Sequence, residues 1–97
     1  MIVRFSPRAT KDLAEIADYI RSRNPSAARH VRTAILDGVG LLAQFPYAGR
    51  RQDFETVRKL VIRRYPYLVY YTVDSASDEV IVIAVQHTAR EREYSDL

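Results

Sequence analysis

The chain has 97 residues, 47% of them hydrophobic and 28% charged, and it contains no cysteine. This composition predicts one ordinary globular domain spanning residues 1–97. The lack of cysteine excludes disulfides and thiol chemistry, and two histidines without a cluster of carboxylates predict no metal site and no cofactor. No apolar run reaches the roughly 18 residues of a membrane span, and no signal segment precedes the first predicted strand. We therefore expect a cytoplasmic protein without membrane association.

Positive charge is concentrated in one short segment. The net charge of the whole chain is +3, whereas residues 50–64 carry six Lys or Arg residues against two acidic ones, a surplus of four. The six are Arg50, Arg51, Arg58, Lys59, Arg63 and Arg64. A local field of this kind attracts nucleic acid or an acidic protein partner. The alternative is a solvated loop and strand edge, where positive charges block edge-to-edge pairing, and both interpretations remain open.

The first half of the chain predicts a strand followed by two helices. Residues 2–5 read as a short strand, and Ser6-Pro7 then combines a good N-cap with a proline at the first helical position. Asn24-Pro25 repeats that signal for the second helix, which Phe45-Pro46 ends. Apolar residues recur at helical spacing in both helices: Leu13, Ile16, Ala17 and Ile20, then Ala28, Val31, Ile35, Val39 and Leu42. We expect an antiparallel hairpin whose apolar faces pack on a sheet, with Gly38 and Gly40 allowing close approach.

The second half predicts three strands in close succession, at residues 57–64, 67–73 and 80–85. Their connections are too short for parallel crossovers, so the three strands form an antiparallel meander. Residues 47–56 precede them as a loop in which Gly49 supplies a turn. The predicted fold is therefore α+β, with an N-terminal strand, a two-helix antiparallel hairpin and a three-stranded antiparallel meander, in the order β-α-α-β-β-β.

The predicted sheet is apolar on both faces. Strict alternation places Tyr67, Val69 and Tyr71 on one face of the middle strand, opposite Leu68 and Tyr70. In the last strand, alternation sets Val80, Val82 and Ala84 against Ile81, Ile83 and Val85. Because a helical hairpin covers only one face, we expect the other face to stay partly apolar and to receive a protein partner. The alternative is a narrow, curled second face with scattered exposure.

Four motifs in this order resemble the RelE/ParE toxin superfamily over nearly the whole chain. They are Phe45-Pro46-x-x-Gly49-Arg50, Leu60-x-x-Arg63, Tyr67-Leu-Val-Tyr-Tyr-x-Val73 and Val85-x-His87-x-x-Arg90. The resemblance implies the fold derived above and a neighbouring antitoxin. RelE-like members cut messenger RNA on the ribosome, whereas ParE-like members poison DNA gyrase without cutting RNA. The Gly49-Arg50 corner and the His87-x-x-Arg90 ending look more like the ParE branch.

Cleavage of RNA by the RelE route needs a base for the ribose hydroxyl, an acid for the leaving oxygen and cations at the phosphate. The positions where the RelE pattern carries arginines hold Tyr67 and Thr88 in this chain. The residues that could still form such a site are His87, Tyr94, Lys59 and Arg63, with Arg90 as a further phosphate ligand. Each has a structural alternative: His87 as a hydrogen-bonded residue at a strand end, and Tyr94 as packing for a C-terminal turn.

The resemblance and the missing arginines together predict a non-catalytic, ParE-like inhibitor of DNA gyrase. A cognate ParD-like antitoxin, with a ribbon-helix-helix fold and a disordered acidic tail, would neutralise it. No sequence-specific DNA binding is expected. The residues expected to bind antitoxin or target are Arg50, Arg51, Arg58, Arg63, Arg64, Tyr67, Val69, Tyr71, His87 and Arg90. The alternatives are a ribosome-dependent endoribonuclease and a non-toxic member that only binds its antitoxin.

Overall fold

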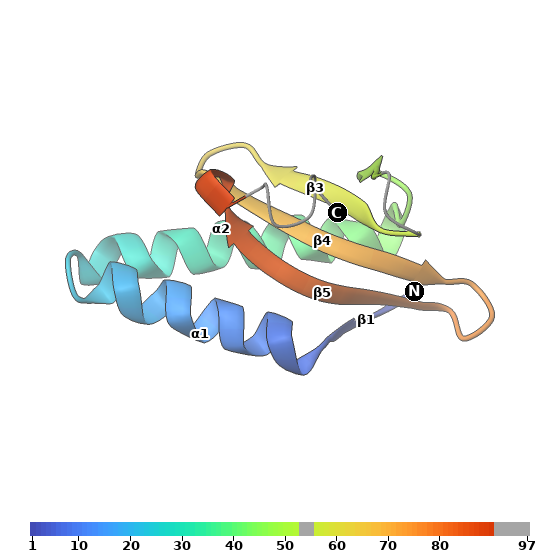
Figure 1. Ribbon diagram of the computed structural model, residues 1–97, viewed down its shortest axis with the longest axis horizontal. Helices are drawn as coiled ribbons and strands as arrows, with labels where there is room; N and C mark the ends of the chain where they lie inside the picture. Colours follow the sequence, from blue (N-terminus) through green and yellow to red (C-terminus); the bar gives the residue numbers. More distant parts are fainter. Residues whose placement is uncertain (53–55, 91–97) are drawn as a thin grey trace.

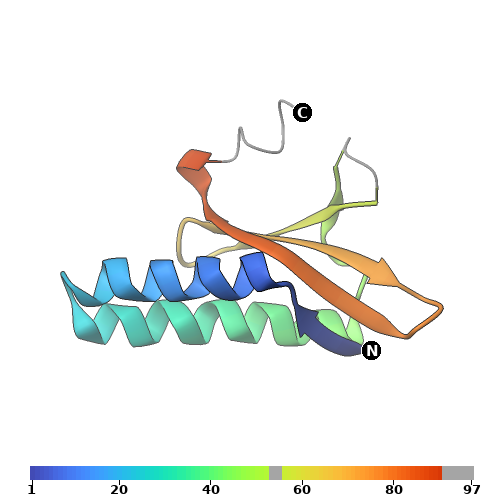
Figure 2. The same cartoon turned by 60° about the horizontal axis from the view of Figure 1, so that its bottom comes forward.

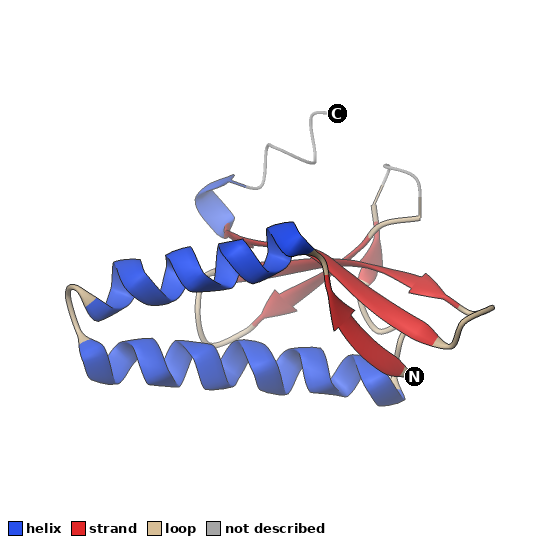
Figure 3. Ribbon diagram, turned by 90° about the horizontal axis from the view of Figure 1, so that it is seen from below, coloured by secondary structure: helices blue, strands red, loops and turns tan. Residues whose placement is uncertain are grey.

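The computed structural model describes residues 1–52 and 56–90. In this part of the chain a hairpin of two helices forms one layer, and a five-stranded sheet lies across it (Figure 1, Figure 2). Figure 3 shows the two helices side by side, with β1 leading into the start of the first helix. The elements are β1 (Ile2–Phe5), α1 (Pro7–Arg21), α2 (Pro25–Gln44), β2 (Arg50–Arg51), β3 (Arg58–Ile62), β4 (Tyr67–Asp74), β5 (Glu79–His87) and the 3₁₀ turn η1 (Thr88–Arg90).

Both helices begin as their sequence signals predict. The side chain of Ser6 accepts a hydrogen bond from Ala9 N at 3.0 Å, and that of Asn24 accepts one from Ala27 N at 3.2 Å. Each cap precedes a proline in the first turn, where the missing N–H costs nothing. The entire predicted apolar face of α2 is buried. None of the helices in the described ranges combines the length and hydropathy needed to cross a bilayer.

The two glycines of α2 differ in their surroundings. A Cβ on Gly38 would lie 2.8 Å from Ile62 Cδ1, so this glycine lets the helix lie close to β3. A Cβ on Gly40 would meet nothing within 4 Å. The predicted close approach is therefore confirmed at Gly38, where it involves the sheet, and is wrong at Gly40, which faces open space.

The strand order in the sheet is β1-β5-β4-β3-β2. The meander of β3, β4 and β5 is antiparallel as predicted. Two further strands belong to the sheet. β1 pairs in parallel with residues 79–82 of β5. The two-residue β2 lies within the predicted loop over 47–56 and pairs with β3. Because β1 is so short, the edge of β5 opposite β4 has α1 and not a strand beside its second half.

A β-bulge in β5 changes which residues share a face. Tyr70 pairs with Ala84 but Tyr71 pairs with Val82, so Ile83 is an extra residue. Val85 accordingly packs with Val80 and Val82 under the helices, whereas Ala84 lies in a cluster on the other side. The predicted alternation of 80–85 is confirmed through Ile83 and wrong at Ala84 and Val85, because it assumed a regular strand.

The face of the sheet turned away from the helices is closed at its centre. Leu68, Tyr70 and Ala84 are buried there in one cluster with Val57, and Ile83 packs against it. The prediction of an open apolar second face is therefore wrong at these residues. Val57 comes from the segment before β3 and Ile83 is the bulge residue, so side chains outside the regular alternation cover this face.

Candidate functional site

A cluster of positive side chains lies at the corner where α2 ends and β2 begins. Arg50 pairs across the strands with Lys59, and Arg51 pairs with Arg58, so both residue pairs of β2 and β3 join two cations. Like charges directly opposite each other destabilise a sheet. Within residues 1–52 and 56–90, neither Arg50 nor Arg51 forms an ion pair with a carboxylate. We call residues 45–51 together with Arg58 the cationic corner.

Tyr71 and Arg58 hold the cationic corner in place. The Tyr71 hydroxyl accepts a buried hydrogen bond of 2.8 Å from Gly49 N. Arg58 Nη1 donates to the carbonyls of Tyr47 and Gly49, at 3.2 and 2.9 Å, and its guanidinium lies 5.0 Å from the centre of the Tyr47 ring. Burial raises the pKa of Tyr71, while the Gly49 hydrogen bond and the Arg58 charge oppose this rise. These contacts fix the loop and the Arg58 guanidinium.

Gly49 has no side chain, and this lets the loop of the cationic corner lie against Tyr71. A Cβ at this position would lie 2.6 Å from the Tyr71 hydroxyl oxygen and 2.9 Å from the Lys59 carbonyl oxygen. The sequence predicts a turn glycine, but Gly49 has no positive φ. Its role is to let the loop approach Tyr71, which a side chain would prevent.

Arg63 and Arg64 lie apart from the cationic corner. They occupy the exposed turn between β3 and β4, whereas Arg58 begins β3. The five residues of β3 separate the two groups by about 16 Å, at 3.3 Å per residue. The positive segment of the sequence therefore forms two distinct sites.

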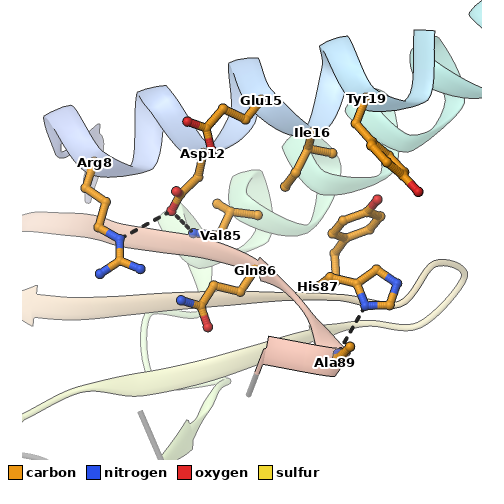
Figure 4. A pocket seen from close by; sticks show the side chains of 10 residues that line it. Arg8, Asp12, Glu15, Ile16, Tyr19, Val85, Gln86, His87 and Ala89 are labelled. Atoms are coloured by element: carbon orange, nitrogen blue, oxygen red, sulfur yellow. Dashed lines mark hydrogen bonds and ion pairs between the residues drawn. The ribbon is translucent and has the colours of Figure 1, made fainter. Parts of the chain in front are cut away.

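A groove of about 500 Å³ lies between α1 and the end of β5, with His87 at its mouth (Figure 4). The His87 ring meets the Tyr67 ring edge-on at 5.5 Å, and its Nδ1 accepts a hydrogen bond from Ala89 N at 3.0 Å. Neutral His87 therefore carries its proton on Nε2. Burial raises the pKa of Tyr67, and the neighbouring Tyr19 adds to this rise.

The sheet separates two of the residues considered for RNA cleavage. His87 is paired with Tyr67, and Lys59 is paired with Tyr70. Directly paired residues share a face, and residues three apart on a strand point to opposite faces. His87 therefore lies on the helix side of the sheet and Lys59 on the other side. Arg63 is in the turn beyond β3, and Tyr94 and the side chain of Arg90 lie outside the described residues.

Three of the predicted binding residues lie in the core. Tyr67, Val69 and Tyr71 belong to the cluster under the helices, and Val69 and Tyr71 are fully buried. The hairpin covers the face on which they were expected to meet a partner, so their side chains are out of a partner's reach in this structure. Exposed apolar residues that the sequence analysis missed lie elsewhere: Tyr19 on α1, Leu41 in the last turn of α2, and Phe45 and Tyr47 at the cationic corner.

Residues 1–52 and 56–90 contain no group of three or more His, Asp or Glu side chains placed to share a metal ion. The chemistry available at the corner is that of guanidinium groups beside aromatic and aliphatic side chains. Such a surface binds carboxylates or phosphates through charge-assisted hydrogen bonds.

Comparisons with known proteins agree on one family. The family model for the ParE toxin of the type II toxin–antitoxin system parDE matches residues 3–92. Toxin RelE2 of Caulobacter vibrioides is 35% identical to this chain, and the match covers 86% of this chain and 90% of that protein. Toxin RelE3 of the same species is 30% identical, and the match covers 93% of this chain and 97% of that protein. The fold is similar to a chain of the chromosomal ParDE system of Pseudomonas aeruginosa, with a TM-score of 0.78 and 23% identity over 90% of this chain and 95% of that one.

Proposed function

Because this chain belongs to the RelE/ParE superfamily and is a toxin of a type II toxin–antitoxin system, we propose that it inhibits DNA gyrase by binding and does not cut RNA. A cognate ParD-like antitoxin neutralises it, and both act in the cytoplasm, where gyrase works. The match to the ParE family model and the likeness to a ParDE chain support this choice of branch.

The observation that carries the proposal is the placement of His87 and Lys59 on opposite faces of the sheet. An endoribonuclease needs its base, its acid and its phosphate-binding cations around a single phosphate, within hydrogen-bond reach. A sheet between the imidazole and the ammonium prevents them from serving one phosphate. Tyr67, at a position where the RelE pattern has an arginine, is buried and brings no fixed charge.

The proposed antitoxin partner rests on the solved relatives. The similar chain from Pseudomonas aeruginosa comes from a ParDE system, and a chain of the RelBE2 toxin–antitoxin complex from Mycobacterium tuberculosis has the same fold, with a TM-score of 0.67 and 23% identity over 89% of this chain and 95% of that one. We propose that this chain likewise forms a complex with the product of a neighbouring gene, a ribbon-helix-helix protein with an acidic tail.

The test compares two activities of one preparation. The purified chain is added to DNA gyrase, with supercoiling and trapped cleaved DNA as readouts, and separately to translating ribosomes, with cleavage of the messenger as the readout. We expect gyrase inhibition and intact RNA. Cleaved messenger, or no effect in either assay, would overturn the proposal.

His87→Ala sharpens the comparison. If His87 acted as an acid or base, its loss would lower a cleavage rate by about 10²–10⁴ while the fold persisted. Under the proposal, His87 supplies at most one binding contact, so gyrase inhibition falls by much less than this factor. A matched control is His30→Ala, because His30 is exposed on α2, far along the sequence from the β5 terminus.

A further inference from the structure

A second concentration of positive charge lies on the helical hairpin, outside the segment 50–64. Residues 19–36 contain four arginines and no acidic residue. They form the last turn of α1, the loop that follows it and the first part of α2. This loop lies at the opposite end of α2 from the cationic corner (Figure 1). The hairpin therefore carries a positive surface that is separate from the corner.

Three of these arginines surround one groove, which we call the hairpin groove. It has a volume of about 310 Å³ and lies between the end of α1 and the start of α2. Arg29 and Arg32 are exposed and stand three positions apart on α2, so they are neighbours on one face of the helix. Arg21 lines the groove from α1. The lining residues are Ala17, Arg21, Pro25, Ala28, Arg29 and Arg32.

Few carboxylates of the chain balance these charges. Arg21 forms an exposed ion pair of 3.4 Å with Asp18 on the same helix. Arg29 and Arg32 form no ion pair with a carboxylate within residues 1–52 and 56–90. Two guanidinium groups on neighbouring positions of one helix face are therefore available to an anion from outside the chain.

The side chains around the hairpin groove favour phosphates over a protein partner. Besides the arginines, the groove is lined by two alanines and one proline, which offer no large apolar anchor of the kind that dominates protein interfaces. In the described ranges, the only large exposed apolar residue along the adjoining groove of the hairpin is Phe5, which is 36% exposed. A guanidinium instead binds a phosphate through paired hydrogen bonds, and such contacts hold nucleic-acid backbones without reading bases.

We infer that the hairpin groove binds the phosphate backbone of double-stranded DNA without reading its sequence. The inference rests on the proposed function in one respect: DNA is the molecule that gyrase holds. The chain then contacts the enzyme with one surface and the enzyme's DNA with the hairpin. Two contacts made together hold an inhibitor more tightly than either contact alone.

The first test measures DNA binding in the absence of gyrase, by fluorescence anisotropy of a short labelled duplex at several salt concentrations. Arg29→Gln/Arg32→Gln removes two charges and keeps residues that favour a helix. The control, Arg4→Gln/Lys11→Gln, makes the same change in net charge, but both of its cations are already paired with glutamates. Arg29→Lys/Arg32→Lys keeps the charge and loses the planar fork of each guanidinium. Thermal melts establish that each variant folds.

We expect Arg29→Gln/Arg32→Gln to weaken duplex binding by at least about tenfold at low salt. It should also reduce the slope of log K against log salt concentration by about 2, because two phosphate contacts are lost. The lysine variant keeps the wild-type slope and loses less affinity.

The control variant should lose less than about threefold in affinity, with an unchanged slope. Equal losses in the control and in Arg29→Gln/Arg32→Gln would show that net charge alone attracts the DNA, and would overturn the inference. Stronger competition by polyglutamate than by unlabelled duplex, at equal concentration of charge, would assign the groove to an acidic protein and would also overturn it.

Gyrase inhibition by the same variants separates this inference from the proposed function. We expect Arg29→Gln/Arg32→Gln to need a higher concentration than wild type for half-inhibition of supercoiling, and the control to match wild type. If wild type binds the duplex as expected but does not inhibit gyrase, the proposed function fails and the DNA site stands. If wild type inhibits gyrase but Arg29→Gln/Arg32→Gln binds the duplex as tightly as wild type, only the inference fails.

Discussion

The carboxylate of Asp12 accepts a hydrogen bond of 2.9 Å from the backbone N–H of Val85, joining α1 to β5 across 73 positions of sequence. This bond lies beyond the last β1–β5 residue pair, between Phe5 and Val82. Ser6, between β1 and α1, makes two similar bonds, from its N–H to the Val82 carbonyl and from its hydroxyl to the Ile83 carbonyl. The start of α1 thus takes the place of a strand along the bulged part of β5.

Asp12→Ala tests how much the hydrogen bond from Val85 N–H to the Asp12 carboxylate stabilises the fold. The variant leaves the Val85 N–H without its acceptor in a partly buried position. We expect the free energy of unfolding to fall by about 1–3 kcal/mol, measured by urea denaturation. The control is Glu15→Ala, one turn further along α1, which removes only an exposed ion pair with Lys11 and costs about 0.5 kcal/mol or less. Equal losses of unfolding free energy in Asp12→Ala and Glu15→Ala would show that the Asp12–Val85 hydrogen bond does not stabilise the fold.

The local signals in the sequence were sufficient to predict most elements of the fold. Ser6-Pro7 and Asn24-Pro25 place the helix starts because capping depends on neighbouring residues alone. The bulge at Ile83 could not be predicted from neighbouring residues. It is accommodated by bonds from Ser6 and Asp12, which lie more than 70 positions away in the sequence. One extra residue then moves Val85 to the helix face and Ala84 to the other face.

The candidate site was predictable in its charge but not in its shape. The arginines of residues 50–64 stand out in the sequence, yet the extended β3 carries Arg58 and Arg63 to opposite ends. Whether His87 and Lys59 share a face depends on register, which sequence alone does not specify. Leu41 could have been found from the pattern, because it falls outside the buried stripe of α2.

Gly49→Ala and Gly40→Ala form a matched pair of predictions. At Gly49 the new methyl group would lie 2.6 Å from the buried Tyr71 hydroxyl oxygen and 2.9 Å from a backbone oxygen. Relief requires moving the loop or breaking the Gly49–Tyr71 hydrogen bond, so we expect a loss of about 1–3 kcal/mol of stability. At Gly40, inside α2 with open space around it, alanine should add about 0.5–1 kcal/mol. Thermal or urea unfolding of both variants measures the two changes in stability, which should have opposite signs. A change of the same sign in both variants would contradict this explanation.

Tyr71→Phe tests whether the buried hydroxyl shapes the cationic corner. The change removes the only atom by which Tyr71 holds Gly49 N, and it leaves that N–H buried without this acceptor. We expect a loss of about 1–3 kcal/mol in unfolding free energy and faster amide hydrogen exchange at Gly49. The comparison is Tyr47→Phe, whose exposed ring keeps its contact with Arg58 and whose stability should stay within about 0.5 kcal/mol of wild type. Unchanged exchange at Gly49 in Tyr71→Phe would show that Arg58 alone holds the loop.

The buried tyrosines predict a loss of stability at alkaline pH. Burial is the main reason that the pKa values of Tyr67 and Tyr71 lie above the usual 10.0. The unfolded chain therefore releases these phenol protons at a lower pH than the folded chain. Between the two values the folded state binds more protons, so the free energy of unfolding falls as pH rises. This contribution to stability is complete below pH 10.0 and is lost as pH rises through the folded-state pKa values.

Tyr67→Phe isolates one of these groups without disturbing the Gly49–Tyr71 hydrogen bond. We expect the urea midpoint to fall less steeply with rising pH above 10 in this variant than in wild type. The reason is that the variant lacks one phenol proton that the folded wild-type chain retains and the unfolded chain releases. Below that range the two proteins should show parallel pH dependence. Identical slopes above pH 10 would mean that Tyr67 ionises equally easily in the folded and unfolded chains, and that its placement beneath α1 does not shield it from water.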